Sequence, residues 1–200
     1  NGLVSDVFGP KQMALLRGHV GIAHCRYPTA GSSGSDEAQP FYANAPFGIS
    51  LAHNGNLTNT ETLRREVIEQ DHRHINTQSD SEVLLNVLAH ELLEQGSLSP
   101  ESALKAVEGV HRRARGGYSV VATVFGLGLL AFRDPNGIRP LVMGKRETEL
   151  GTEYAVVSES AALDILGFAR MRDVAPGEAV VITEAGELFC YNAAPGQKHT

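Results

Sequence analysis

Residues 116–125, Gly-Gly-Tyr-Ser-Val-Val-Ala-Thr-Val-Phe, mark the point where the pattern of the chain changes from helical to β. The β-branched and aromatic residues after the glycine pair are typical of a strand, and we expect one over Tyr118–Phe125. The stretch therefore separates a helical block that precedes it from a series of strands that follows it.

Three helix starts precede this stretch. Thr58–Glu61 and Ser79–Glu82 each place a hydroxyl residue three positions before a glutamate, which predicts a capping box, and Ser99-Pro100 places proline at the first helical position. Apolar residues then recur at helical spacing, so the second and third helices each present one apolar stripe to a core. These residues are Val83, Leu84, Val87, Leu88 and Leu92 in the second helix, and Leu104, Val107 and Val110 in the third.

Strands are expected on the other side of the stretch. Asp134-Pro135-Asn136-Gly137 predicts a tight turn between two of them. A short helix is expected over Ser160–Phe168, and Glu178–Thr183 is expected to pair with Glu187–Tyr191 across Glu184-Ala185-Gly186. The other expected strands are Leu129–Arg133, Arg139–Lys145 and Tyr154–Ser158.

Two further strands are expected near the N-terminus, over His19–Arg26 and Phe47–His53, because both stretches alternate small and larger side chains. Between them lies a small, polar loop, Ala30–Asp36, of the kind that forms a substrate lid. Strands that surround a helical block indicate an α+β fold, and 200 residues suit a single domain.

Composition excludes several classes of protein. Apolar residues make up 42% of the chain and charged residues 20%, as in ordinary globular domains. The formal net charge of −6 has the wrong sign for binding nucleic acid. The apolar run Val120–Phe132 is too short for a bilayer and is interrupted by glycines, and Asn1–Asp6 does not resemble a signal peptide. Two cysteines without zinc-type spacing, Cys25 and Cys190, fit a cytoplasmic protein.

Three short segments carry groups that could perform chemistry. In His24–Thr29, the guanidinium of Arg26 could bind a carboxylate bidentately, although a surface arginine and a plain turn threonine, Thr29, are the simpler interpretations. His53–Asn56 ends the expected strand at an Asn-Gly pair. Such a pair is ordinarily a turn, but it can also present an amide side chain and an unhindered backbone N–H as an oxyanion hole.

The third segment, Ser79–Glu82, places the carboxylate of Asp80 on the first turn of a helix. Its interaction with the helix dipole would explain Asp80 without any function. The same carboxylate could equally bind the ammonium group of a substrate.

Taken together, His24–Gly31, His53–Asn56 and Ser79–Glu82 resemble, in this order, the signatures of the class II glutamine amidotransferases. Ala131–Leu141 and Arg172–Glu178 resemble more specifically the glutamine phosphoribosylpyrophosphate amidotransferases, or amidophosphoribosyltransferases. The similarity extends from Asn1 to about Tyr191. It implies an N-terminal-nucleophile hydrolase fold, a four-layer sandwich of two antiparallel sheets between helix layers, here without its first strands.

The resemblance also implies roles for single residues. Arg26 would bind the carboxylate of glutamine with help from Thr29, and Asp80 would hold its ammonium group. Asn54 and the Gly55 N–H would form the oxyanion hole. His53, like His24, would support the site rather than transfer protons.

The nucleophile of this family is a cysteine at the mature N-terminus, whose own α-amine acts as the base. This chain begins with Asn1, at a point that matches a later stretch of the family sequence, so we expect residues 1–200 to be an incomplete glutaminase domain that hydrolyses no glutamine alone. Cys25 is a poor substitute, because on a strand it would face away from its neighbour Arg26.

The resemblance implies further partners for the parent protein. Its glutaminase domain would need no cofactor and would supply ammonia to a phosphoribosyltransferase domain, absent here, that uses Mg²⁺ and makes 5-phosphoribosylamine from phosphoribosyl pyrophosphate in purine synthesis. The parent is expected to be a homo-oligomer. Two alternatives are another class II amidotransferase with a different ammonia acceptor, and a glutamine-binding module that has lost its nucleophile.

Overall fold

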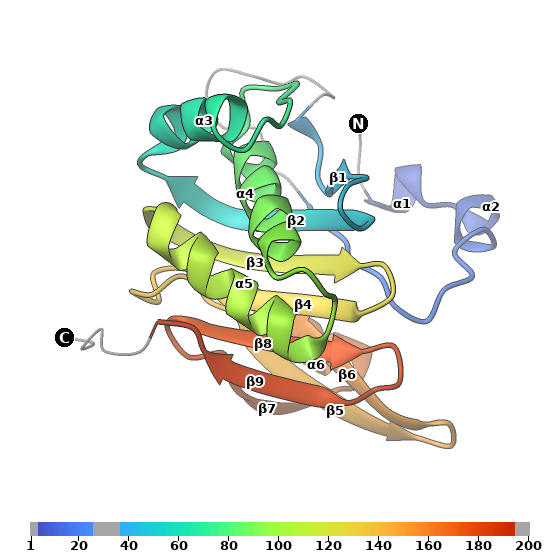
Figure 1. Cartoon of the computed structure of the whole chain (residues 1–200). Helices are drawn as coiled ribbons and strands as arrows, with labels where there is room; N and C mark the ends of the chain where they lie inside the picture. The colour runs from blue at the N-terminus through green and yellow to red at the C-terminus, as the bar shows by residue number, and fades with distance from the viewer. Residues whose placement is uncertain (1–3, 26–36, 195–200) are drawn as a thin grey trace.

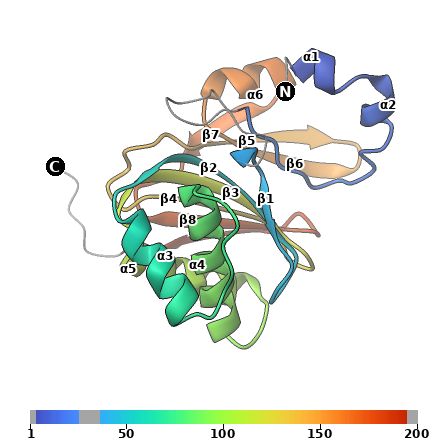
Figure 2. The same cartoon turned by 90° about the horizontal axis from the view of Figure 1, so that it is seen from above.

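The computed structural model describes residues 4–25 and 37–194, and it has four layers. Three helices cover one face of a six-stranded sheet. A three-stranded sheet and a short helix cover the other face (Figures 1 and 2). The predicted α+β sandwich of two antiparallel sheets with helix layers is confirmed.

The large sheet has the strand order β1-β2-β3-β4-β8-β9, and every neighbouring pair is antiparallel. β2 lies between β1 and β3, and the predicted pairing of β8 with β9 is confirmed. The strands are β1 (Phe41–Ala43), β2 (Ile49–Leu57), β3 (Gly116–Val124), β4 (Gly128–Arg133), β8 (Glu178–Thr183) and β9 (Leu188–Asn192).

The small sheet has the order β6-β5-β7, with β5 over Val142–Thr148, β6 over Gly151–Val157 and β7 over Ala169–Asp173. Helix α6 (Ser160–Leu166) packs against β6 and β7, on the side of the small sheet that faces away from the large sheet (Figure 2).

The helices on the large sheet are α3 (Thr60–Glu69), α4 (Asp80–Glu94) and α5 (Pro100–Arg113). Two short helices, α1 (Val4–Val7) and α2 (Pro10–Met13), lie near the N-terminus.

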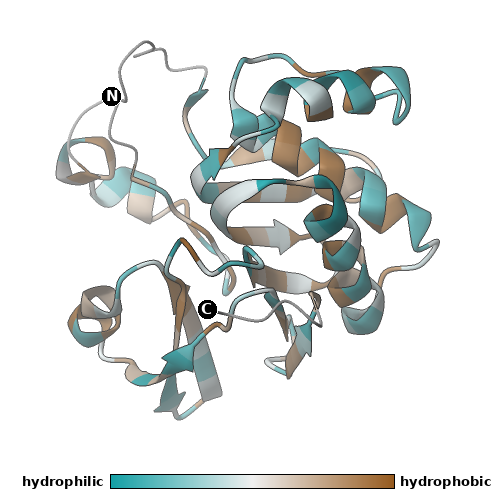
Figure 3. Ribbon diagram, turned by 90° about the vertical axis from the view of Figure 1, so that its left-hand side faces the viewer, coloured by the Kyte–Doolittle hydropathy of each residue, from teal (hydrophilic) through white to brown (hydrophobic). Residues whose placement is uncertain are grey.

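Alternation along β3 shows how the sequence builds two cores. Its even-numbered residues from Tyr118 to Val124 are buried against α4 and α5, as expected where side chains alternate between the faces of a sheet. Val121 points to the opposite face, where Met143 and Val180 belong to the second core, between the two sheets. Figure 3 shows apolar residues concentrated where the helices face the large sheet. All the apolar stripe residues predicted for α4 and α5 are buried.

Two of the three predicted helix starts are confirmed. Ser99 and Ser102 form a capping box at α5, and the side chain of Ser79 accepts a hydrogen bond from the Ser81 N–H at α4. Glu82 does not complete a box with Ser79, because its carboxylate binds Asn76 and Thr77 instead. The prediction for Thr58 is wrong.

Helix α3 begins one residue later than predicted, with Asn59 as the N-cap residue and no side-chain cap. The backbone N–H of Thr58 continues the sheet pairing and donates to the carbonyl of Arg115 (2.8 Å), so it is not available to Glu61 as a capping box requires.

The strand predicted for His19–Arg26 is wrong over residues 19–25, which belong to no helix or strand. Alternation favours a strand, but a strand also needs a neighbour for its backbone groups, and no described strand pairs with this segment. The strand predicted over Arg139–Lys145 begins at Val142, because the Arg139 N–H is bound by Asp134. The short strands β1 and β7 were not predicted.

Candidate active site

The Asn-Gly pair at positions 54–55 lies within β2 and forms no turn, so the simpler interpretation of this pair is wrong. Asn54 pairs with Ser119 and Gly55 with Tyr118, and the ladder continues to Leu57. Gly55 has φ of 140°, and a Cβ there would lie 2.0 Å from the Gly117 carbonyl oxygen. Only glycine allows β2 and β3 to approach this closely.

Asp80 joins the N-terminus of α4 to the end of β2. Its Oδ2 accepts a hydrogen bond from the Leu57 N–H (2.9 Å), and its Oδ1 lies 3.8 Å from Nδ1 of His53. The Asp80 side chain keeps 21% of its surface exposed. The carboxylate is thus fixed beside the Asn54-Gly55 pair and still accessible to a small cation.

His53 is buried beneath this carboxylate, with Nδ1 3.1 Å from Oγ of Ser81. Burial lowers the pKa of His53, and it outweighs the opposing attraction of Asp80; His24 and Arg139 lower the pKa further. At neutral pH the ring is therefore uncharged, and it supports Asp80 and Ser81 without competing for an anionic group.

The direction of the Gly55 N–H follows from its partner on β3. The N–H and the carbonyl of Tyr118 both bond to Asp134, which lies on the side of β3 away from β2. The Gly55–Tyr118 pair is therefore one that exchanges no hydrogen bonds, so the Gly55 N–H points to the outer edge of β2. The N–H groups of His53 and Leu57 point to the same edge, where the Gln39 Oε1 (2.7 Å) and Asp80 accept from them.

Asp134, from the predicted tight turn, supports the strand opposite Gly55. It is fully buried, and its carboxylate accepts hydrogen bonds from the backbone N–H groups of Tyr118, Asn136, Ile138 and Arg139. The turn itself is confirmed by the Gly137 N–H bond to the Asp134 carbonyl (2.9 Å). The turn residues signalled a loop here, but no sequence signal identified this carboxylate as the group that anchors β3.

Four of the predicted site residues lie together: His53, Asn54, Gly55 and Asp80 gather where β2 meets α4. Arg26, Thr29 and the expected lid over residues 30–36 lie outside the described residues. His24, at the end of the described N-terminal segment, acts electrostatically on His53.

The two cysteines have different environments. Cys25 is exposed. Cys190 lies on β9, where its Sγ accepts a hydrogen bond from Arg172 (3.2 Å). Burial raises the pKa of the Cys190 thiol, and the nearby Arg172 does not fully offset this, so Cys190 holds little of the reactive thiolate at neutral pH.

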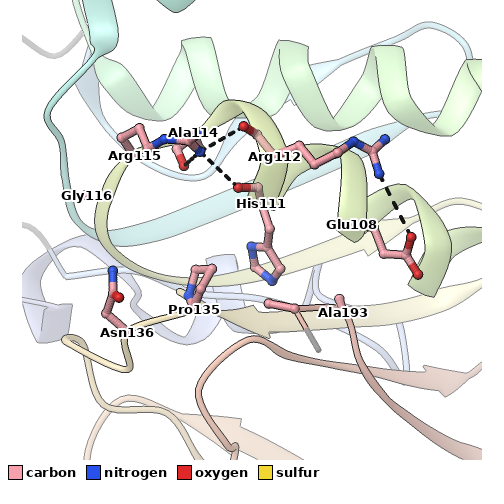
Figure 4. Close-up of a pocket in the computed structure, with 10 residues that line it drawn as sticks. Glu108, His111, Arg112, Ala114, Arg115, Gly116, Pro135, Asn136 and Ala193 are labelled. Atoms are coloured by element: carbon pink, nitrogen blue, oxygen red, sulfur yellow. Dashed lines mark hydrogen bonds and ion pairs between the residues drawn. The ribbon is translucent and has the colours of Figure 1, made fainter. Parts of the chain in front are cut away.

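A cavity of about 600 Å³ lies at the C-terminal end of α5, bordered by His111, Arg115, Asn136 and Ala193 (Figure 4). None of the gathered site residues lines it. Arg115 donates to the carbonyls of His111, Arg112 and Ala114, so its guanidinium terminates the helix. Across residues 4–25 and 37–194 there is no cluster of His, Cys, Asp or Glu that could hold a metal ion, and no helix is long and apolar enough to cross a membrane.

Comparison with known proteins identifies the family of the chain. A family model described as a glutamine amidotransferase domain matches residues 24–164. The amidophosphoribosyltransferases of Pseudomonas aeruginosa and Escherichia coli are 60% and 57% identical to the chain, and the alignments cover 100% and 97% of it. That of Saccharomyces cerevisiae is 53% identical over 91% of the chain. The chain spans 40%, 39% and 36% of the length of these three relatives.

Two solved structures are similar to the fold. A structure titled as the allosteric regulatory enzyme of purine biosynthesis has a TM-score of 0.70 and 28% identity, covering 86% of this chain and 35% of that one. The glutamine phosphoribosylpyrophosphate amidotransferase of Bacillus subtilis, complexed with ADP and GMP, has a TM-score of 0.69 and 27% identity, covering 86% and 34%.

Proposed function

Because the chain belongs to the glutamine amidotransferase domain family, we propose that its site at the end of β2 hydrolyses glutamine to glutamate and ammonia within an amidophosphoribosyltransferase. In the full-length protein the ammonia would replace the pyrophosphate of phosphoribosyl pyrophosphate and form 5-phosphoribosylamine. The identity to three amidophosphoribosyltransferases over at least 91% of the chain supports this choice of ammonia acceptor.

The observation that carries the proposal is the Gly55 N–H. It points to the part of the β2 edge that no described strand covers, between two N–H groups that have side-chain acceptors. In amide hydrolysis the carbonyl oxygen becomes negatively charged in the tetrahedral intermediate, and a fixed N–H donor stabilises this charge without reorganisation. Asn54 is adjacent in sequence, and its side-chain amide would be the second donor.

Asp80 would recognise the other end of the substrate. Glutamine carries an α-ammonium group, and the Asp80 carboxylate is fixed by Leu57, partly exposed and close to Asn54-Gly55. Arg26 and Thr29 would bind the α-carboxylate, as the resemblance implies. His53 would stay neutral beneath Asp80 and hold it in place.

Neither cysteine of the chain would be the nucleophile. Cys190 lies on β9, at the far edge of the sheet from β1, and its raised pKa disfavours the thiolate. Cys25 is exposed on a segment that forms no strand, so no sheet pairing holds its thiol against the Gly55 N–H.

Substitution of Asn54 by alanine in the full-length protein tests the proposal. Loss of one oxyanion donor is expected to lower kcat for glutamine hydrolysis about 10²- to 10³-fold and to leave KM nearly unchanged. Asn44→Ala, an exposed asparagine next to β1, is the matched control and should retain wild-type kinetics. An Asn54→Ala protein with normal kcat would overturn the assignment. A wild-type protein that binds glutamine without hydrolysing it would favour a binding module.

A further inference from the structure

The edge of β2 changes its partner halfway along its length. β1 covers only the beginning of this edge, where Phe41 pairs with Leu51 and Ala43 with Ile49. Beyond Leu51, no described strand continues along this edge. The N–H groups of His53, Gly55 and Leu57 follow one another there.

Gln39 supplies the hydrogen-bond acceptor at the first of these positions. Phe41 lies opposite Leu51, so the antiparallel register places Gln39 opposite His53. Its side chain is used in place of its backbone: Oε1 accepts from the His53 N–H at 2.7 Å. Asp80 has the same role on the other side of Gly55, where it accepts from the Leu57 N–H.

Gln39 and Asp80 bind the backbone of β2 on both sides of Asn54-Gly55, the proposed oxyanion hole. Bonds at His53 and Leu57 restrain the backbone before and after Asn54-Gly55, and the Gly55 N–H between them is the donor that the proposed function assigns to the substrate oxygen. On the opposite side, only glycine fits against β3, because a Cβ at position 55 would lie 2.0 Å from the Gly117 carbonyl oxygen.

We propose that Gln39 is a positioning residue for glutamine hydrolysis, which fixes β2 at His53 so that Asn54 and Gly55 point at the developing oxyanion. The inference rests on the proposed function of this site. Gln39 acts through the backbone of His53 and does not itself contact the substrate, so its effect should fall on the transition state and not on glutamine binding. A misplacement of donors by a fraction of an ångström weakens stabilisation of the oxyanion, and we expect a loss of about 10-fold in kcat.

Two variants of nearly the same size as glutamine separate the acceptor from the shape of the side chain. Gln39→Leu removes Oε1, whereas Gln39→Glu keeps an acceptor at the same reach. Gln70→Leu is the matched control, because Gln70 is an exposed glutamine at the end of α3, outside the site. All three are made in the full-length protein.

Two measurements test the proposal independently. The first is amide hydrogen exchange at His53, which should be faster in Gln39→Leu, while exchange at Leu57 stays as in the wild type. The second is glutamine hydrolysis: kcat should fall about 10-fold in Gln39→Leu with KM nearly unchanged, and Gln39→Glu should recover most of the loss.

Unchanged exchange at His53 in Gln39→Leu would show that the hydrogen bond does not hold the strand, and the proposal would be wrong. Faster exchange with unchanged kcat would equally overturn it, because the bond would then have no bearing on the reaction. A rise in KM as large as the fall in kcat would make Gln39 a binding residue. Failure of the wild type to hydrolyse glutamine would overturn the proposed function itself, and the exchange at His53 would still report on Gln39.

Discussion

At the scale of single residues, the first turn of α4 carries two carboxylates that differ in exposure and in hydrogen bonding. Asp80 gives one oxygen to Leu57 and remains partly exposed. Glu82 is buried, and both of its oxygens accept hydrogen bonds from Asn76 and Thr77. Burial opposes the ionisation of Glu82, but these hydrogen bonds outweigh it and lower its pKa. One acid is available to a ligand, and the other holds the loop before the helix.

We therefore expect Asp80→Asn and Glu82→Gln to affect different quantities. Asp80→Asn keeps an acceptor for Leu57 but loses the charge that would bind the glutamine ammonium group, so KM should rise about 10- to 100-fold, the size of a charge-assisted hydrogen bond. Glu82→Gln should leave KM near wild type and lower the free energy of unfolding. Steady-state kinetics of both variants measure KM, and urea unfolding measures the free energy of unfolding. Equal rises of KM in the two variants would contradict it.

The sequence predicted the residues of the site that belong to recognisable motifs, and not those that support them. Asn54, Gly55 and Asp80 were singled out because their segments together resemble the signatures of the class II glutamine amidotransferases. Gln39 could not be predicted, because its contact with His53 depends on the register between β1 and β2. The three residues of β1 are too few to produce a detectable alternation.

At the scale of elements, α5 is joined to β3 and β4 by a small buried aromatic cluster. The His111 Nδ1 lies 2.8 Å from the Tyr118 hydroxyl, and the Phe132 ring meets both rings edge-on, with centroids 5.9 Å and 6.3 Å away. Burial lowers the pKa of His111 to about 4, against the opposing attraction of Asp134. Protonation of His111 would place a charge between the helix and the sheet.

This cluster predicts a loss of stability in mild acid. In the unfolded chain His111 titrates near 6.5, so it takes up a proton there before it does in the folded protein. The contribution of neutral His111 to the free energy of unfolding is complete above pH 6.5 and is lost as the pH falls toward 4. Between pH 7 and pH 5 the loss amounts to about 2 kcal/mol. Urea unfolding at pH 7 and pH 5 measures how much the free energy of unfolding falls between these two values. This fall should be smaller in His111→Gln than in the wild type by about 2 kcal/mol. An equal fall in the two proteins would argue against a neutral, buried His111.

Elements with strong local signals were predicted well, and those that depend on distant partners were not. The start of α5 was predicted because Ser99-Pro100 determines it locally, and the capping box is present. The start of α3 was misplaced because Thr58 belongs to the sheet through Arg115, 57 positions away. Alternation over residues 19–25 was equally misleading, because no described strand lies beside that segment.

At the scale of the whole molecule, one arginine links the three helices that cover the large sheet. The guanidinium of Arg113, near the end of α5, lies 2.7 Å from Asp71 after α3, 3.4 Å from Glu91 on α4 and 3.7 Å from Glu66 on α3. Its side chain is only 17% exposed. Burial disfavours its charge, but the hydrogen bonds to Asp71 and Glu91 outweigh burial and raise its pKa.

Removal of this arginine should destabilise the helix layer. Arg113→Leu leaves three carboxylates close together, and we expect the free energy of unfolding to fall by about 2 to 4 kcal/mol, as when one partner of a buried ion pair is lost. Lys145→Ala, which breaks an exposed pair with Glu147, should cost about 0.5 kcal/mol or less. Chemical denaturation of the two variants provides the comparison. A similar small cost for both would mean that Arg113 is no more than a surface charge.

The part of the β2 edge that no described strand covers has one more consequence, for aggregation. An unpaired strand edge attracts the edge of another molecule, and proteins usually protect such edges by covering them or by keeping them short. Here the edge must stay open at Gly55 if a substrate oxygen is to reach it. Among residues 37–194, the side chains of Gln39 and Asp80 occupy the N–H groups on either side of Gly55. Within the described part of the chain, an incoming strand would meet two bonded N–H groups around Gly55, so Gln39 and Asp80 would also hinder edge-to-edge association at the proposed site.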